Sequence, residues 1–482
     1  MKLLKQIAFV TLVCVCAAGC RTTKDVLRDY ETNLSTGNYS GSTPELLELA
    51  DKEDGSQLLW RLMAASSFHY MDSHETDAIR QFDLAESVLQ KNDQTSVFAQ
   101  GSEGAFAMLT NDRVFSYDGG GLDRIFTCVY RGIDFLCTDD RDNARVEFNR
   151  AAQYQRNWLY DRRKDIDEAA KKLESDATAY QKKQNTKEEN PSEAVSTAMT
   201  DESFSTQIRE KTGFDPATSG NLDTLPQSAY VNAYATHLTG VFRWINGDNG
   251  LDDLKLAAAV KPDIACATRD FAECEKNVNP TNQVWIWVED GLCPVREEWR
   301  IDLPLVLIPY ANKYILYAGM ALPVLRERTC GATVWNAVIG DTTVPFEELE
   351  NIDRLVRTEY DVFMRGALTR EITRTLVRAG VQVGLGIAAD QADDWKTKLA
   401  LRATQVGVAT WAVASTAADI RSWTALPKRV MAVRFDRPAD GVVQLVADGQ
   451  IIPLTIPTGN SLVFIRKPAP LAQPVVKIVT YQ

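Results

Sequence analysis

The sequence is poor in the residues that most often bind metals. It has three histidines, His69, His74 and His237, in 482 residues, and no Cys-x-x-Cys pair. Zinc sites are built mainly from clustered Cys and His, so a zinc site is not expected. There is also no Gly-x-Ser-x-Gly motif, and the glycine run at 119–121, which follows Asp118, is not followed by Lys-Ser or Lys-Thr. We therefore expect no serine-hydrolase site, no phosphate loop and no cofactor.

Positive charge is also in short supply. The chain has 53 Lys and Arg against 65 Asp and Glu, a net charge of −12, and no basic run interleaved with aromatic residues. Such a chain is not expected to bind nucleic acid. A hydrophobic content of 45% and a charged content of 24% are typical of a globular protein, and the length allows two to four domains.

The first twenty residues have the pattern of a bacterial lipoprotein signal. Lys2 and Lys5 precede an apolar run at Ile7–Val15, and Ala17–Cys20 is a run of small residues that ends in cysteine. Small residues are needed there because the signal peptidase takes the chain in an extended form. We expect Cys20 to be lipidated, and the alternative is an ordinary secretory signal cleaved nearby.

This pattern predicts that the protein is located in the cell envelope. Residues 1–19 are the expected signal peptide, and the apolar run is too short to cross a hydrocarbon core of about 30 Å as a stable anchor. Arg21 rather than Asp follows Cys20, which favours the outer membrane, facing the periplasm. Residues 20–55 are polar and rich in turn residues, and they predict a tether between the lipid and the folded body.

Residues 56–278 predict a helical, repeat-like domain. Small and aromatic residues recur at spacings expected of tetratricopeptide repeats, in which antiparallel helices approach closely: Ala78, Gly132, Phe135, Ala144, Phe148 and Ala151. The separation between Ala78 and Ala144 is close to the length of two repeats of about 34 residues each. An unrelated helical bundle is the alternative. Residues 145–183 predict one long charged helix, followed by a polar insertion, expected to be a loop, at about 184–226.

Near residue 279 the sequence pattern changes from purely helical to a mixture of strands and helices. Residues 279–427 predict a mixed region, with a strand at 283–291 and two apolar helices, 346–389 and 395–418, as a buried hairpin. Residues 428–482 predict a small antiparallel β domain, because short strands alternate with turn residues. Its expected strands are 430–435, 442–447, 451–456, 461–466 and 475–480. The predicted fold class is thus α+β: helical repeats, a mixed α/β region and a small C-terminal β domain.

An oxidising compartment would permit disulfides among the six cysteines that follow Cys20. We expect Cys266–Cys274, which closes a short loop-like stretch, and then Cys293–Cys330. Cys128 and Cys137 are expected to stay reduced, because nine residues of one helix span about 13 Å, too far for a disulfide.

Four stretches resemble a family of uncharacterised bacterial envelope lipoproteins with tetratricopeptide-like helices and a shared C-terminal region. They are 117–119, 143–151, 289–298 and 419–427, and the last two are the more specific. The long charged helix and the 184–226 insertion depart from the family pattern. The resemblance implies an association with lipoprotein activators of peptidoglycan synthases, and it transfers no catalytic residue.

Two functions follow as hypotheses. The first is a non-enzymatic scaffold, anchored in the membrane through Cys20, whose helical repeats bind another envelope protein of unknown identity. The second is a cell-wall glycan hydrolase that uses the acids on either side of Gly291: Glu289, Asp290, Glu297 and Glu298. Paired carboxylates hydrolyse glycans when they are held about 5 to 9 Å apart in one cleft. The alternative explanation is a turn whose acids pair with Arg296 and Arg300.

Overall fold

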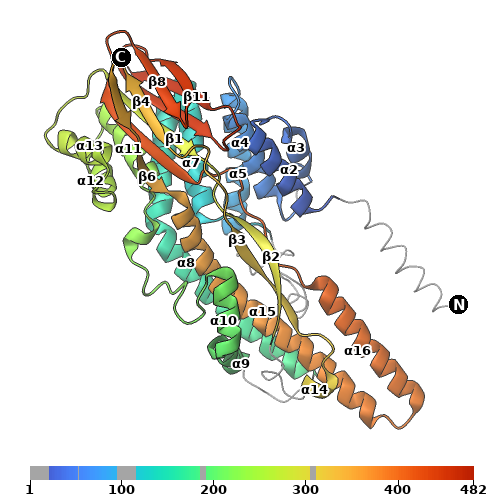
Figure 1. Ribbon diagram of the computed structural model, residues 1–482. Coiled ribbons are helices and arrows are strands. Elements are labelled where there is room, and N and C mark those ends of the chain that lie inside the picture. The colour runs from blue at the N-terminus through green and yellow to red at the C-terminus, as the bar shows by residue number, and fades with distance from the viewer. Residues whose placement is uncertain (1–20, 53, 95–115, 185–190, 304–310, 482) are drawn as a thin grey trace.

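A computed structural model describes residues 21–52, 54–94, 116–184, 191–303 and 311–481 (Figure 1). Helices hold 53% of the chain and strands 18%, with helices towards the N-terminus and sheets towards the C-terminus, so the fold is α+β as predicted. The molecule is elongated: a β-sandwich covered by helices forms one end, and a helical hairpin forms the other (Figure 1). Within the described residues, no helix is long and apolar enough to cross a membrane.

Residues 23–50 form two helices rather than the predicted tether. α2 (Thr23–Thr36) begins at Thr22, whose side chain caps the helix together with Asp25. Val26, Tyr30 and Leu34 lie on one face of α2 and are buried, as is Leu46 of α3 (Thr43–Ala50). The apolar positions are few but correctly spaced, and the turn at residues 37–42 only joins the two helices.

Most of the other helices that precede the first strand pack against their neighbours along the chain. They are α4 (Gln57–His69), α5 (Glu75–Gln94), α7 (Gly121–Cys137), α8 (Arg141–Gln184), α11 (Ala233–Ile245), α12 (Leu251–Val260) and α13 (Ala265–Glu275). The long charged helix is confirmed as α8. Small residues do lie where helices approach: a Cβ on Gly132 would come within 2.7 Å of Phe148, and one on Gly240 within 2.8 Å of Leu254. A tetratricopeptide array is not confirmed.

The central sheet, sheet A, has the order β11-β10-β1-β7-β6. Its strands are β1 (Gln283–Asp290), β6 (Glu347–Asn351), β7 (Arg429–Asp436), β10 (Asn460–Lys467) and β11 (Val475–Tyr481). β1 pairs parallel to β10 and antiparallel to β7. The predicted boundary at residue 428 therefore does not separate two domains. β1 is buried along its whole length, so it needs a neighbour on each side, and the C-terminal segment supplies both.

A second sheet, sheet C, packs on sheet A to form the sandwich. Its order is β5-β4-β8-β9, with β4 (Trp335–Ile339), β5 (Thr342–Pro345), β8 (Val442–Ala447) and β9 (Gln450–Thr455). Val284, Ile286 and Val288 of β1 point into the core between the sheets. Trp285 and Trp287 alternate with them and pack in the core shared with the helices.

The other end of the molecule is built around α15 (Ile352–Gln391). Against it lie the ribbon of β2 (Val295–Asp302) and β3 (Gly319–Arg326), the short helices η3 (Gln227–Tyr230) and α14 (Ala311–Tyr314), and α16 (Trp395–Ser415). The polar insertion is not a plain loop, because it contains α9 (Pro191–Thr200) and α10 (Glu202–Thr212). Phe204 and Ile208 of α10 are buried in the core beside α15.

The predicted hairpin of two helices is present, but only α15 is extensively buried, and α16 is largely exposed. α16 packs on α15 through a narrow strip, and only Gln405, Ala409 and Ala412 of α16 are buried. The alanine-rich sequence suits this close approach, but it leaves most of the helix surface exposed.

Candidate functional site

The acidic cluster around Gly291 is divided among three places. Glu289 and Asp290 are neighbours on β1 and point to opposite faces of sheet A. Asp290 is buried; its carboxylate accepts hydrogen bonds from Arg429 Nε and from the backbone N–H of Ala332, both at 2.9 Å. Burial raises the pKa of Asp290, and Arg429 opposes the shift.

The other two acids lie on β2, which belongs to a separate sheet. Glu297 is half exposed and pairs with Arg326 at 2.6 Å. Glu298 pairs with Arg300 at 3.0 Å, as the alternative explanation predicted, and accepts a hydrogen bond from the backbone of Ala418. The four acids do not line one cleft, so the glycan-hydrolase hypothesis loses the geometry that it requires.

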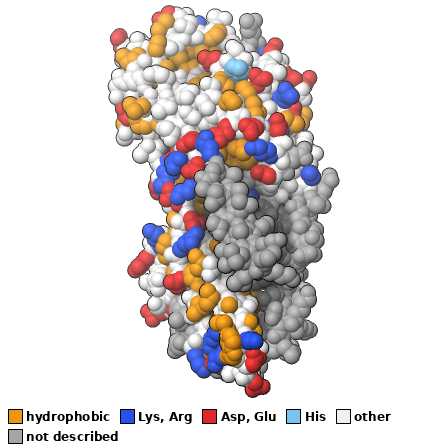
Figure 2. Space-filling model, turned by 90° about the vertical axis from the view of Figure 1, so that its right-hand side faces the viewer, with side chains coloured by type: hydrophobic (Ala, Val, Ile, Leu, Met, Phe, Trp, Pro, Cys, Tyr) orange, Lys and Arg blue, Asp and Glu red, His pale blue; other side chains and the backbone are white. Residues whose placement is uncertain are grey.

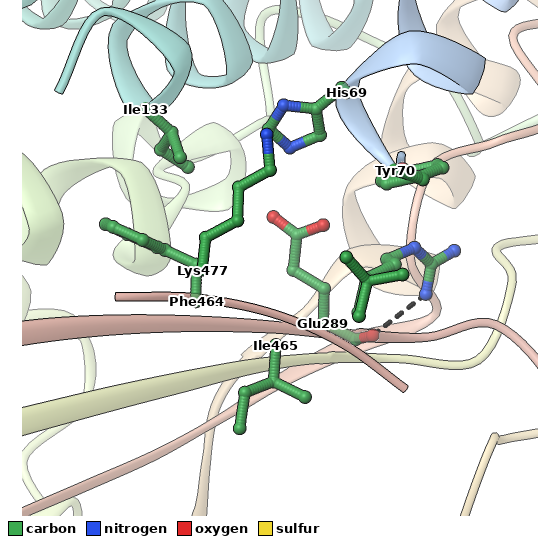
Figure 3. Close-up of a pocket in the computed structure, with 9 residues that line it drawn as sticks. His69, Tyr70, Ile133, Glu289, Phe464, Ile465 and Lys477 are labelled. Carbon is green, nitrogen blue, oxygen red and sulfur yellow. Dashed lines mark hydrogen bonds between the residues drawn. The ribbon is translucent and has the colours of Figure 1, made fainter. Parts of the chain in front are cut away.

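Glu289 is instead the centre of a buried polar layer between the helices and sheet A (Figure 3). Its two carboxylate oxygens accept hydrogen bonds from Tyr130 of α7, at 2.9 Å, and Tyr234 of α11, at 3.0 Å. Burial raises the pKa of Glu289, and the nearby guanidinium of Arg466 acts against this shift. Arg466 donates to the backbone carbonyls of Glu289, Gly291 and Ala425, which fixes β10 to the turn after β1.

A second group of charges adjoins Glu289. Asp134 of α7 accepts from His69 Nδ1 and from Lys477 Nζ of β11, both at 2.8 Å. Burial acts to raise the pKa of Asp134, but His69 and Lys477 outweigh it, so the pKa lies below its usual value. The cavity beside these residues is about 20 Å³, room for one water molecule and not for a substrate.

A third group lies over the first half of β1. His237 of α11 forms two hydrogen bonds. Its Nε2 lies 2.7 Å from the carboxylate of Asp270 of α13, and its Nδ1 lies 3.2 Å from the indole nitrogen of Trp287. An indole N–H only donates, so His237 Nδ1 accepts and Nε2 carries the proton that it donates to Asp270. Asp270 also accepts from Trp285 and pairs with buried Arg434 of β7.

This histidine–aspartate arrangement resembles part of a catalytic triad, but an indole takes the place that a nucleophile would need. Its partners come from α11, α13, β1 and β7, so the physical effect is to fix the helices on the sheet. In the described part of the chain, no group of His, Cys, Asp and Glu side chains is placed to hold a metal ion.

The glycine run at 119–121 has a structural explanation. A Cβ on Gly121 would collide with Trp158 and come within 2.6 Å of the Tyr230 hydroxyl. Asp123, near the start of α7, accepts from the backbone of Gly120 at 2.8 Å and from the Tyr117 hydroxyl. Burial raises the pKa of Asp123 to about 6, and Glu359 adds to the shift. These glycines allow close packing around a helix N-terminus.

The predicted disulfide Cys266–Cys274 is wrong. Both residues lie in α13, and eight residues of helix separate them by about 12 Å, whereas a disulfide needs Cα atoms within about 7 Å. Cys293 and Cys330 are also free thiols here. α7 contains both Cys128 and Cys137 as one continuous helix, so the reason for expecting them to stay reduced is confirmed. Cys20 lies outside the described residues.

Two exposed surfaces stand apart from this internally paired body. The outer face of sheet C carries uncharged side chains only: Asn336, Val338, Thr343, Pro345, Val442, Gln444, Val446, Ile451, Pro453 and Thr455. α16 exposes the second surface, with Trp395, Leu399 and Val406 more than half exposed. Figure 2 shows broad areas of uncharged side chains over the upper part of the molecule and an apolar area near its lower end.

Comparison with known proteins identified no relative: no family model, curated protein or solved structure matches this chain.

Proposed function

We propose that this protein is a lipid-anchored scaffold of the bacterial cell envelope, a binding protein rather than an enzyme, and that it binds another envelope protein through the outer face of sheet C. The observation that carries the binding proposal is the composition of that face. An antiparallel sheet that faces water normally alternates buried apolar residues with polar and charged ones. On sheet C the outward positions include Val442 and Ile451, 47% and 58% exposed, and no charged residue.

Depletion of charged residues is the feature that distinguishes the centre of protein interfaces from the rest of a surface. The two edge strands, β5 and β9, contain Pro345 and Pro453, which have no backbone N–H to donate. We therefore expect the partner to lie on the face of the sheet rather than to add a strand at its edge. The helical repeats that the sequence assigns to partner binding do not carry the proposal, since a repeat array is not confirmed.

The location rests on the lipoprotein signal at Ala17–Cys20. Changing Cys20 to Ser removes the site of lipid attachment. We expect the variant either to appear in the soluble fraction or to accumulate as the uncleaved precursor, and not as a mature protein in the membrane fraction. Metabolic labelling with a fatty acid that is retained by the Cys20→Ser variant would contradict the anchor.

The binding surface is tested by photo-cross-linking in cells. A cross-linking amino acid at Val442 or at Ile451 is expected to give the same discrete protein adduct, because the two positions share one face. Tyr160, exposed on α8, is the matched control and is expected to give no such adduct. An identical adduct from all three positions, or none from sheet C, would refute the proposed surface.

A further inference from the structure

α16 exposes an apolar face that no other part of the described chain covers. Trp395, Leu399, Val406 and Val413 are 70%, 61%, 55% and 42% exposed. Their spacing of four, seven and seven residues places them along one side of the helix. Gln405, Ala409 and Ala412 face α15 instead, so the apolar side chains are not needed to hold α16 in place.

The charges of α16 are confined to the turns near the tip of the hairpin. Lys396, Lys398 and Arg402 are its only charged residues, and none follows between Ala403 and Ser415. Arg402 pairs with Asp390, whereas Lys396 and Lys398 are exposed and form no ion pair within the described chain. Asp394 caps the helix by accepting from the backbone of Thr397. Two available ammonium groups therefore adjoin Trp395.

The start of the body lies on the same side of the molecule. α2, α3 and α16 are on one side of the long axis, opposite α12 and α13 (Figure 1). α2 begins at Thr23, so at most about 10 Å of extended chain separates it from Cys20. Without the predicted tether, a lipid on Cys20 holds this side of the body close to the bilayer.

We propose that the exposed face of α16 lies on the anionic lipid surface of the membrane that anchors Cys20; the inference rests on the lipid anchor of the proposed function. Trp395 suits the headgroup region, where an indole places its ring in the apolar part and its N–H in the polar part. Lys396 and Lys398 complement lipid phosphates, and Leu399, Val406 and Val413 enter the acyl boundary. The bound helix lies along the surface, like other interfacial helices.

Vesicle flotation tests this contact without the lipid anchor. The protein used is residues 21–482, which keeps every element that the structure describes. It is expected to float with vesicles of phosphatidylethanolamine and phosphatidylglycerol. Trp395→Ser combined with Leu399→Ser is expected to lower the partition constant about tenfold. Lys396→Glu with Lys398→Glu is expected to weaken binding to these anionic vesicles by a similar factor.

The matched control is Val442→Ser with Ile451→Ser on sheet C, which removes two other exposed apolar side chains (47% and 58% exposed) and is expected to leave flotation unchanged. All the substituted residues are exposed, and an unchanged circular dichroism spectrum verifies the fold. Failure of residues 21–482 to float, or equal flotation of the Trp395/Leu399 variant, overturns the inference. A discrete protein adduct from a cross-linker at Val406 in cells, with no flotation, assigns α16 to a protein partner instead.

The two proposals fail separately. Loss of vesicle binding while the adducts from sheet C persist refutes the membrane contact only. Loss of those adducts while flotation persists refutes the partner surface only.

Discussion

The body of the molecule, formed by sheets A and C and the helices on sheet A, treats its charged residues differently from the α15–α16 hairpin. In the body, Arg434, Asp270 and Glu289 are buried and each has named partners on neighbouring elements. At the tip of the hairpin, apolar residues such as Leu399 are exposed while a charged pair, Arg402 and Asp390, lies at the surface. Nearer the body, α15 buries the pair Arg374–Glu371. The buried charges of the body are paired within it, whereas the outer surface of α16, like the outer face of sheet C, has the composition of a contact surface.

The largest expected effect comes from breaking a buried pair of the body. Arg434→Met keeps most of the side-chain volume but leaves Asp270 without its cationic partner. Removing one partner of a buried ion pair generally costs about 3–5 kcal/mol, since the other charge stays desolvated. We expect the free energy of unfolding, measured with denaturant, to fall by about this amount.

The hairpin supplies the matched control. Arg402→Met removes a pair whose side chains are 37% and 31% exposed. Exposed pairs contribute roughly 0–1 kcal/mol, so we expect a change within that range. Equal losses in the two variants would show that burial does not distinguish the two regions.

A second comparison concerns the pH dependence of stability. Asp123 in the body is expected to change the free energy of unfolding by up to roughly 3 kcal/mol. The pKa of Asp123 is raised from 3.8 to about 6, so the folded state binds this proton more tightly than the unfolded chain. Its contribution to stability is therefore lost as pH rises from about 4 to about 6. Asp123→Asn removes the titration, and its stability relative to the original protein should rise over this window.

Asp390 in the hairpin should show the opposite sign. Hydrogen bonds from Lys313 and Tyr314 lower its pKa to about 2, so its contribution is present above about pH 4 and is lost as pH falls towards 2. Asp390→Asn is expected to destabilise slightly at neutral pH and to have no effect near pH 2. Denaturant titrations from pH 2 to 7 measure both variants, and a pH-independent difference for Asp123→Asn would contradict the argument.

Local patterns in the sequence predicted individual elements well. β1 follows from its run of β-branched and aromatic residues, and the strands after residue 428 follow from turn residues such as Asp448-Gly449, which forms the β8–β9 turn. The pairing of β1 with β10 was not predictable in this way, because parallel partners have no connecting turn. The burial of α2 was not predictable from composition either. Its apolar residues are few, and they indicate a buried face only once their helical spacing is recognised.

The polar layer was missed for a related reason. Glu289, Tyr130 and Tyr234 come from three elements, and no local spacing connects them. One signal was available: Arg434 and Arg466 interrupt strands that are otherwise apolar. A charged residue in the middle of a buried strand requires a buried partner, which predicts a polar network but does not identify its members.

Two glycine substitutions, one in the body and one in the hairpin, should have effects of opposite sign. Gly121→Ala in the body puts a Cβ against Trp158 and the Tyr230 hydroxyl, and such overpacking costs about 1–3 kcal/mol. Gly407 lies inside α16, and apart from its own stretch of helix nothing in the described chain lies within 4 Å of the position where its Cβ would be. Gly407→Ala should therefore stabilise the helix by about 0.5–1 kcal/mol, because alanine loses less backbone entropy. Thermal and denaturant unfolding of both variants measure the two signs, and destabilisation by Gly407→Ala would contradict the open surroundings of this position.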